Sequence, residues 1–430
     1  METLLGVVTV ALSGLFAGGG AWPFKLLRKY QFEHWWFIAI FFALLVVPWG
    51  VTLFGCPDPI GGLRVIWSEH RDALIKANLL TLAWGVANVL CGVCYVRIGV
   101  ALTGAILAGL GVCVGTTMPL VFKGTGQFAE SSGLWSRAGL TVMAGVAVML
   151  IGVLLATFAG LGRDAQLKRL VTDAKEAPRT SGRIVIGLLM AALSGVLSAG
   201  LAMSSVYSQA PIIANLSAVQ PDSTIKLAIV DEKAVPKDVC KTIAREYQVD
   251  SNGRIQMDGV GEVALGGLKA AQAAPRIDAR IAAAQIPGHP QVRVETGSIP
   301  AVFGVTANGV IGGLLVNLGF AIYLLTRNKS WHVFFSSPVD FILSLTIAAN
   351  SVASIILIVK GMLWLGALGA SVGFGIQQAM QMTGCQAVGF VSGEWRGVRG
   401  RPRTLMYAAI AFLIVAAAIM VIGKKLGSTQ

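Results

Sequence analysis

Charged residues are scarce in this sequence. Only 13% of its 430 residues are Asp, Glu, Lys or Arg, whereas 55% are hydrophobic and the mean hydropathy is +0.72. A water-soluble chain of this length needs far more charge to cover its surface. The 52 glycines point the same way, because small residues let membrane helices approach closely. The composition therefore excludes an ordinary soluble protein and favours a membrane protein.

Long stretches without any charged residue recur along the chain. About 20 apolar residues span the hydrocarbon core of a bilayer, and ten stretches are of about that length or longer. They are residues 3–24, 35–54, 77–96, 98–122, 138–161, 184–219, 299–326, 341–359, 361–393 and 404–423. The sequence predicts ten spans, the two longest being tilted, kinked or running out of the membrane. No Lys or Arg precedes the first stretch, so it lacks the positive region of a signal peptide and is predicted to be a span.

Acidic residues are missing from the interior of every predicted span. An intramembrane carboxylate is the usual sign of a proton relay. Proton coupling would therefore depend on titratable residues at span ends, and the candidates are Glu33, His34, Asp340 and Glu394.

Other kinds of chemistry also lack their residues. The four histidines lie in loops or at span ends, so no metal cluster is visible, and no phosphate-binding loop is present to drive an ATP-dependent pump. The sequence predicts no enzyme, no cofactor and no metal site.

The net charge of +13 could suggest nucleic acid, but its distribution does not. When alternate short loops are assigned to two sides, one side holds roughly twice as many basic residues as the other. The positive-inside rule makes that side cytoplasmic. Both termini are then predicted to be extracytoplasmic, and the membrane is predicted to be the bacterial cytoplasmic (inner) membrane.

A short small-residue segment occurs twice. "ALSGLFAGG" stands at 11–19 and "ALSGVLSAG" at 192–200, an offset of 181 residues. A second, weaker match joins "IGVALTGAI" (98–106) and "LGALGASVG" (365–373) at an offset of 267, and the long loop after span six accounts for the difference. If spans one and six correspond, the repeating unit is five helices, and the second copy enters from the opposite side. That is the inverted-repeat plan of secondary transporters, with a substrate site near the midplane.

The loop between spans six and seven has a different composition. Residues 219–298 have balanced charge and predict a short strand, a helix around 236–247, an Ala-rich helix and an extended segment. We interpret them as a small extracytoplasmic domain or lid, and a tolerated insertion without a role in transport is an equal alternative. The predicted fold is thus an all-α polytopic membrane protein: ten transmembrane helices in two inverted five-helix repeats, with this insertion between helices six and seven. The predicted parts are 1–218 (with the repeat boundary near 183), 219–298 and 299–430.

Uncharged polar residues do enter the spans. Sugars present hydroxyls to amide side chains and an apolar face to aromatic rings, so these residues and neighbouring tryptophans could line a site for a neutral polyol. Packing through interhelical hydrogen bonds is the alternative for each of them. The candidates chosen from the residues themselves include Trp22, Trp84, Asn88, Thr116, Ser198, Asn317 and Gln377.

Six short motifs in order resemble one known family. They are "PFKLLRKY" (23–30), "WGVAN" (84–88), "VGTTMP" (114–119), "SGVLSAG" (194–200), "NLGF" (317–320) and "GEWRG" (393–397). Together they resemble the L-rhamnose–proton symporter family of the drug/metabolite transporter superfamily, whose members have ten helices in two inverted halves. The resemblance spans nearly the whole chain except the insertion.

The resemblance implies proton-linked uptake of a 6-deoxy sugar. It places Lys25, Trp84, Asn88, Thr116, Ser198 and Asn317 at the central cavity. The chain departs from the enteric symporters in the insertion, and in "GMLWLGALGASVGFG" (361–375), where those symporters have an aromatic and acidic stretch.

Two further functions stay open at this point. A protein of the same fold could export, or let through, another small metabolite, and a membrane sugar sensor could bind its ligand in the outside insertion. The predicted partners are a small sugar, protons and the lipid bilayer, with no nucleic acid and with the oligomeric state open.

Overall fold

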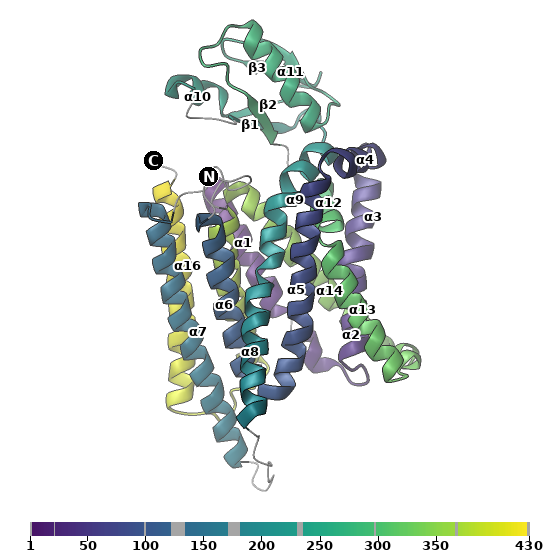
Figure 1. Ribbon diagram of the computed structural model, residues 1–430, viewed down its shortest axis with the longest axis vertical. Helices are drawn as coiled ribbons and strands as arrows, with labels where there is room; N and C mark the ends of the chain where they lie inside the picture. The colour runs from purple at the N-terminus through teal and green to yellow at the C-terminus, as the bar shows by residue number, and fades with distance from the viewer. Residues whose placement is uncertain are drawn as a thin grey trace. The chain divides into compact units, whose positions relative to one another are not determined.

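The computed structural model describes residues 2–20, 22–98, 100–121, 134–170, 181–229, 235–295, 298–365 and 369–427 (Figure 1). Two compact units share this chain. The first comprises Met1–Val46, Lys76–Val206 and Val310–Gln430, and the second comprises Val47–Ile75 and Tyr207–Gly309.

Helices account for all ten charge-free stretches. In chain order the membrane-type elements are α1 (Glu2–Gly19), α2 (Phe32–Ile40) continued by the π-helical η2 (Phe41–Val46) and α3 (Val47–Gly55), α5 (Arg71–Ile98), α6 (Val100–Val121), α7 (Arg137–Leu170), α8 (Ser181–Ser198), α9 (Gly200–Leu216), α12 (Ile299–Gly309), α13 (Ile311–Arg327), α14 (Pro338–Leu365), α15 (Phe374–Val391) and α16 (Arg401–Gly427). Several of them begin at an arginine that ends a charged loop, because that charge stays in water while the apolar run enters the bilayer.

Length and composition support fewer spans than the sequence predicts. Among the described residues, seven helices or helix runs are long and apolar enough to cross a membrane, and an eighth appears if α12 and α13 count as one broken span. Helix α6 contributes only a shorter apolar segment, Ile106–Met118. Helix α15 carries the polar residues Gln377, Gln378 and Gln381 in its first half. The chain is thus a multi-pass helical membrane protein, and ten spans remain a prediction.

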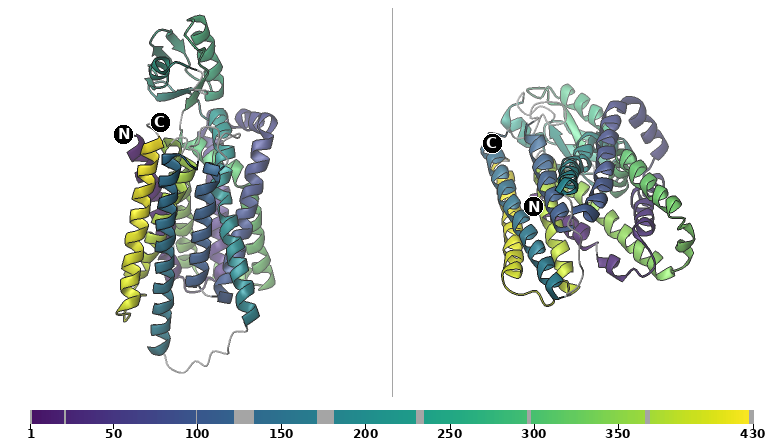
Figure 2. Two further views of the ribbon diagram at one scale, coloured as in Figure 1. Left: turned by 60° about the vertical axis from the view of Figure 1, so that its left-hand side comes forward. Right: turned by 60° about the horizontal axis from the view of Figure 1, so that its bottom comes forward.

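In the first unit, α7 and α16 lie side by side along most of their length (Figures 1 and 2). Helix α1 packs against α14 and α15, and α6 packs against α7 and α8. Helix α1 begins at the same end of the unit at which α16 ends (Figure 1). A buried apolar cluster that includes Val10, Val112, Val146, Ile376 and Leu413 joins five of these helices.

Small residues permit these close approaches. A Cβ atom on Gly14 would stand 2.3 Å from the carbonyl oxygen of Gln377, and one on Gly18 would stand 2.1 Å from that of Gln381. Backbone atoms cannot move aside, so α1 and α15 touch at this distance only because both positions are glycine. The repeated serines tie helices in the same way: Ser13 Oγ donates to the Ser354 carbonyl at 2.7 Å, and Ser194 Oγ donates to the Ala87 carbonyl at 2.7 Å.

The second unit contains the insertion, which folds around its own apolar core. Strand β1 (Thr224–Ile229) is the centre of an antiparallel three-stranded sheet with β2 (Glu246–Gln248) and β5 (Val292–Glu295), in the order β2-β1-β5. Its register pairs Thr224 with Gln248 and Lys226 with Glu295. Strands β3 (Arg254–Met257) and β4 (Gly261–Ala264) form a hairpin, and α11 (Ala270–Ala283) packs against β5. Alternate residues of β1 and one face of α11, including Ile225, Leu227, Ile277 and Ile281, fill the core.

The insertion's strand, its two helices and its extended segment are confirmed, with one boundary wrong. The first helix, α10, is Lys237–Ile243 and does not reach Tyr247. Tyr247 lies in β2 instead, where its buried ring packs in the core and its hydroxyl donates to the Thr242 and Ile243 carbonyls. The β3–β4 hairpin and helix α4 (Pro59–Glu69) were not predicted. In α4, Asp58 caps the N-terminus through the Gly61 amide and pairs with Lys269 at 2.7 Å.

Candidate functional site

Three of the predicted sugar-site residues form one group between α5 and α13. Asn88 Nδ2 donates to Asn317 Oδ1 at 3.2 Å, and Asn317 Nδ2 donates to the Gly313 carbonyl at 2.8 Å. The Trp84 ring lies against Gly313, where a Cβ would meet its Cε3 at 2.7 Å. The contacts seen here are those of interhelical packing, and Asn88 is half-buried.

Thr116 is different because its hydroxyl has no hydrogen-bond partner in the part of the chain that the structure describes. It lies in α6 with no exposed surface, and Thr116 Oγ1 makes no hydrogen bond to any described residue. A threonine in a helix usually donates to the carbonyl four residues earlier, as the adjacent Thr117 does to Cys113 at 2.5 Å. A buried hydroxyl without a partner carries a desolvation penalty.

Gln377 repeats this feature on α15. Its side chain is 9% exposed, and its Oε1 also makes no hydrogen bond to any residue that the structure describes. The turn before α15, the π-helical η6 (Gly369–Gly373), brings this region against α6, because Ser371 Oγ donates to the Thr116 carbonyl at 2.7 Å. Short π-helical segments are frequent at functional sites. The Phe374 ring lies against Gly115, where it supplies an apolar wall.

Ser198 lies next to α6 but satisfies itself locally. Its Oγ donates to the Gly195 carbonyl at 2.7 Å, one turn back in α8. A Cβ on Gly111 would stand 2.5 Å from this oxygen, so the serine faces α6 at a position five residues before Thr116. The first turn of α9 lies near both groups: Leu201 and Trp84 pack against the same buried cluster, and Ala202 belongs to one buried cluster with Phe374.

Three predicted proton-coupling residues form a buried cluster at one end of α2, where every one of them has hydrogen bonds. Asp340 accepts the backbone N–H groups of Arg28, Lys29 and Tyr30 at 3.2, 2.6 and 3.0 Å. Glu33 accepts from Asn328 Nδ2 at 2.9 Å and from Ser330 Oγ at 3.3 Å.

His34 is held on both ring nitrogens in this cluster. Its Nδ1 accepts the Gln31 amide at 3.2 Å, which leaves Nε2 to donate to the Ser330 carbonyl at 3.0 Å. These contacts fix the 28–34 segment to residues 328–330 and, through Asp340, to the first turn of α14.

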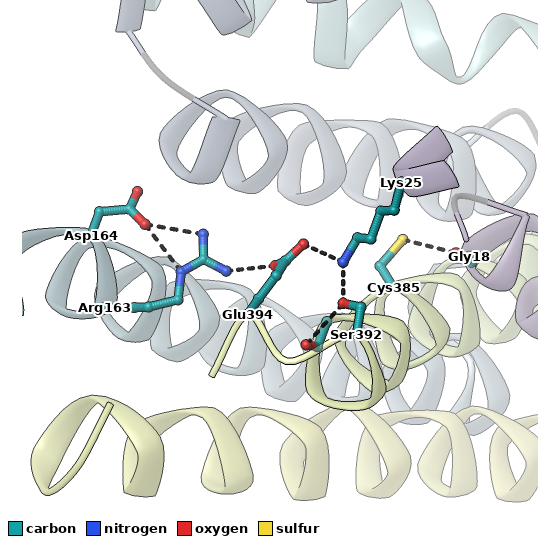
Figure 3. A network of polar contacts seen from close by, with 8 residues as sticks. Gly18, Lys25, Arg163, Asp164, Cys385, Ser392 and Glu394 are labelled. Carbon is teal, nitrogen blue, oxygen red and sulfur yellow. Dashed lines mark hydrogen bonds and ion pairs between the residues drawn. The ribbon is translucent and has the colours of Figure 1, made fainter. Parts of the chain in front are cut away.

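Glu394 lies apart from that cluster and carries the charged network of Figure 3. Its carboxylate pairs with Lys25 Nζ at 2.5 Å and with Arg163 Nη1 at 2.8 Å. Lys25 also donates to Ser392 Oγ, and Arg163 also pairs with Asp164 at 3.0 Å. Lys25 belongs to η1 (Trp22–Leu26), Arg163 to α7, and Glu394 to the turn after α15. Trp22, in the same short helix as Lys25, is exposed.

The pKa of Glu394 reflects two opposed influences. Partial burial raises the pKa of this carboxyl, but the hydrogen bonds and charges of Lys25 and Arg163 outweigh burial and hold the pKa below its ordinary value. Sequence reasoning missed Arg163 and Ser371 as parts of these sites. Arg163 ends one long span and Glu394 lies in a loop 231 positions later, and nothing in the sequence indicates that their side chains pair.

Comparison with known proteins adds the family. The model of the L-rhamnose-proton symport protein family matches residues 3–229, more than half of the chain. The chain belongs to this family. Motifs 317–320 and 393–397 lie outside the matched segment.

Individual members of the L-rhamnose-proton symport protein family agree with that assignment. The L-rhamnose-proton symporter of Mannheimia succiniciproducens is 28% identical over 182 residues, which cover 42% of this chain and 48% of the relative. That of Pectobacterium atrosepticum is equally similar over the same shares. That of Yersinia pestis is 25% identical over 205 residues, 47% of this chain and 54% of the relative. The chain thus spans about half the length of the curated relatives it matches.

The insertion matches a different family. Residues 215–296 are similar to the polysaccharide biosynthesis/export protein family. The boundaries of this match agree closely with those of the insertion and its core.

Proposed function

We propose that this protein is a secondary active transporter that takes up a neutral sugar, with L-rhamnose or a related deoxy sugar as substrate, by proton symport across the bacterial inner membrane. The observation that carries the proposal is the family membership, joined to buried, unpaired polar atoms on α6 and α15. A neutral polyol brings donors and acceptors without charge, which suits spans free of ionisable groups.

Transport would proceed by alternating access between two inverted five-helix halves. Support comes from contacts that recur at the two offsets noted in the sequence. One hydrogen bond joins Ser13 to Ser354, and another joins Ser194 to Ala87. Ser194 is 181 positions after Ser13, and Ala87 is 267 positions before Ser354, so the two hydrogen bonds occupy equivalent positions.

A second pair of contacts obeys the same rule. Gly6 and Gly361 are packed so closely that a Cβ on Gly6 would lie 3.2 Å from the Gly361 carbonyl, and the corresponding contact joins Gly187 and Cys94. Equivalent contacts at equivalent positions are expected when each half repeats one packing pattern.

The sugar would bind between the two groups of candidate residues. Thr116 Oγ1 and Gln377 Oε1 would gain hydrogen bonds to sugar hydroxyls, while the Phe374 and Trp84 rings would cover its apolar face. Asn88, Asn317 and Ser198 would line the same cavity. Each hydrogen bond would replace a desolvation penalty already present in the empty protein, which makes these two atoms efficient determinants of affinity.

Growth on L-rhamnose tests the proposal in cells. The chain would be expressed in a bacterium whose own L-rhamnose uptake has been deleted but whose L-rhamnose metabolism is intact. Restored growth on L-rhamnose, with no growth for cells that carry an empty vector, is the expected result. A well-expressed protein that restores no growth and takes up no labelled L-rhamnose would contradict the proposal, and efflux of a metabolite would then favour an exporter.

The insertion suggests a second role, that of saccharide binding outside the transport path. Its similarity to the polysaccharide biosynthesis/export protein family and its separate core favour this role over a passive loop. Isothermal titration of purified residues 217–298 with L-rhamnose and with rhamnose-containing oligosaccharides tests it. Binding would support a module that senses or captures saccharides. The absence of binding heat with every saccharide would contradict this second role and leave the transport proposal unaffected.

A further inference from the structure

The carboxylate of Glu394 joins two segments that lie far apart in the chain. Lys25 follows the first long helix and Arg163 lies near the end of α7, whereas Glu394 follows α15. If the halves divide near residue 183, both cations belong to the first half and the carboxylate to the second. The two ion pairs, at 2.5 and 2.8 Å, therefore join the two proposed halves (Figure 3).

Water can reach Glu394, unlike the other candidate carboxylates. Its side chain is 43% exposed, whereas Asp340 is 0% and Glu33 is 4% exposed. The donors also differ in kind. Asp340 accepts from backbone amides, which cannot withdraw without unfolding the 28–30 segment, whereas Lys25 and Arg163 are long side chains that can swing away.

The charged groups around Glu394 are mostly cations. The titratable or charged groups that face it or adjoin it are Lys25 from η1, Arg163 and Asp164 from α7, Cys385 from α15, and Arg396 from its own turn. At the start of α16, Arg403 donates to Tyr407 instead. Lys25 and Arg163 thus pair with the same carboxylate, and Arg163 also pairs with Asp164.

We propose that Glu394 takes up the transported proton, and that its ion pairs with Lys25 and Arg163 form a latch that opens when it does. This inference rests on the transport function proposed above. The proton adds to one carboxylate oxygen and gives a neutral carboxylic acid, which leaves both cations without their counter-charge. Loss of the proton to water restores the carboxylate and allows the ion pairs to form again.

The two influences on the Glu394 pKa explain why proton and latch exclude one another. With the cations in place, the pKa lies below its ordinary value, so the latched state is favoured at neutral pH and loses its advantage as the pH falls through that lowered pKa. When the cations withdraw, their lowering effect is lost while burial still raises the pKa. The unlatched state therefore holds a proton at a pH where the latched state releases it.

Reconstituted full-length protein tests this assignment, with Glu394→Gln as the main variant and Asp164→Asn as its matched control. Asp164 also contacts Arg163, but it belongs to the same helix and does not join the halves. Two movements of labelled L-rhamnose are measured: accumulation driven by an inward proton gradient, and exchange for unlabelled sugar at equal pH. We expect E394Q to lose accumulation and keep exchange, and D164N to keep both. Accumulation by E394Q would overturn the assignment, as would loss of exchange by a folded E394Q protein.

Lys25→Met provides a second variant that retains the carboxyl. Loss of one cation raises the pKa of Glu394, so the pH dependence of accumulation should move to higher pH. An unchanged pH profile in K25M would overturn the assignment, because a purely structural contact would not set that profile.

Hydrogen exchange separates failure of the latch from failure of the transport proposal. In sugar-free protein at one fixed pH, the backbone amide hydrogens of residues 392–400 should exchange with solvent faster in E394Q than in the wild type and in D164N. Equal rates in E394Q and the wild type would refute the latch. If the wild type moves no L-rhamnose but E394Q shows faster exchange, the proposed substrate is wrong and the latch stands.

Discussion

Replacing Thr116 by valine should stabilise the empty protein and weaken its affinity for sugar. Valine has nearly the shape of threonine without the hydroxyl, so the packing of α6 is preserved. The Ser371 hydrogen bond to residue 116 is also preserved, because it goes to the backbone carbonyl. The only group removed is a hydroxyl that is fully buried and unpaired among the described residues.

The magnitudes follow from the state of that hydroxyl. Leaving a buried polar group unpaired costs about 1–3 kcal/mol, so its removal should raise the free energy of unfolding by up to that amount. A neutral hydrogen bond to the sugar contributes about 0.5–1.5 kcal/mol, so its loss should raise the dissociation constant roughly 2- to 13-fold.

Thermal unfolding in detergent, with and without L-rhamnose, measures both effects in one series. Thr117→Val is the matched control, because the Thr117 hydroxyl is already paired with the Cys113 carbonyl. We expect T116V to melt higher than the wild type without sugar and to need more sugar for the same upward shift. T117V should show neither change. A T116V protein that melts lower and binds sugar as well as the wild type would refute the reasoning and make Thr116 a packing residue.

Three further predictions concern the fold that holds this site. Gly18→Ala should separate α1 from α15 and lower the melting temperature, because its Cβ would stand 2.1 Å from a backbone oxygen. Gly19→Ala is the control, since a Cβ there meets no atom within 4 Å and should leave the melting temperature unchanged. Equal melting temperatures of the two variants would contradict this account of the packing. Asp340→Ala should leave three backbone N–H groups without their acceptor, at a cost of about 1–3 kcal/mol each, and reduce the yield of folded protein. Asp340→Asn should keep part of this hydrogen bonding and still accumulate sugar. Loss of proton coupling in a folded D340N protein would instead make Asp340 a proton carrier. Residues 217–298 should fold alone with a single cooperative transition by circular dichroism, since all described residues of their core lie within this range. A gradual melt would contradict this.

Much of the helical arrangement could be predicted from the sequence, because charge and apolar length alone decide what can enter a bilayer. The charge-free stretches correspond to helices, and the double occurrence of "ALSG" led to two serines with matching roles. The insertion was predicted less fully. Strands β2, β3 and β4 are only three or four residues long, too short for a clear alternating pattern, and Tyr247 was assigned to the preceding helix.

The candidate site could be predicted only as a set of residue types. The sequence shows which spans contain Asn, Thr and Gln, but whether a side chain has a partner depends on how each helix is rotated. Asn88 and Asn317 form a hydrogen bond across 229 positions. Of the neighbours Thr116 and Thr117, only Thr117 has a hydrogen bond from its hydroxyl among the described residues. The charged network was hidden for the same reason, because Glu394 and Arg163 are brought together by packing between distant helices.

The accumulation of labelled L-rhamnose in proteoliposomes, with and without an inward proton gradient, tests the central claim most directly. The account predicts that the sugar reaches a higher concentration inside than outside only while the gradient is present, and that a protonophore abolishes this difference. Entry that stops at equal concentrations under both conditions would contradict proton symport and make the protein a facilitator. No entry of L-rhamnose into vesicles that contain folded protein would contradict the substrate itself.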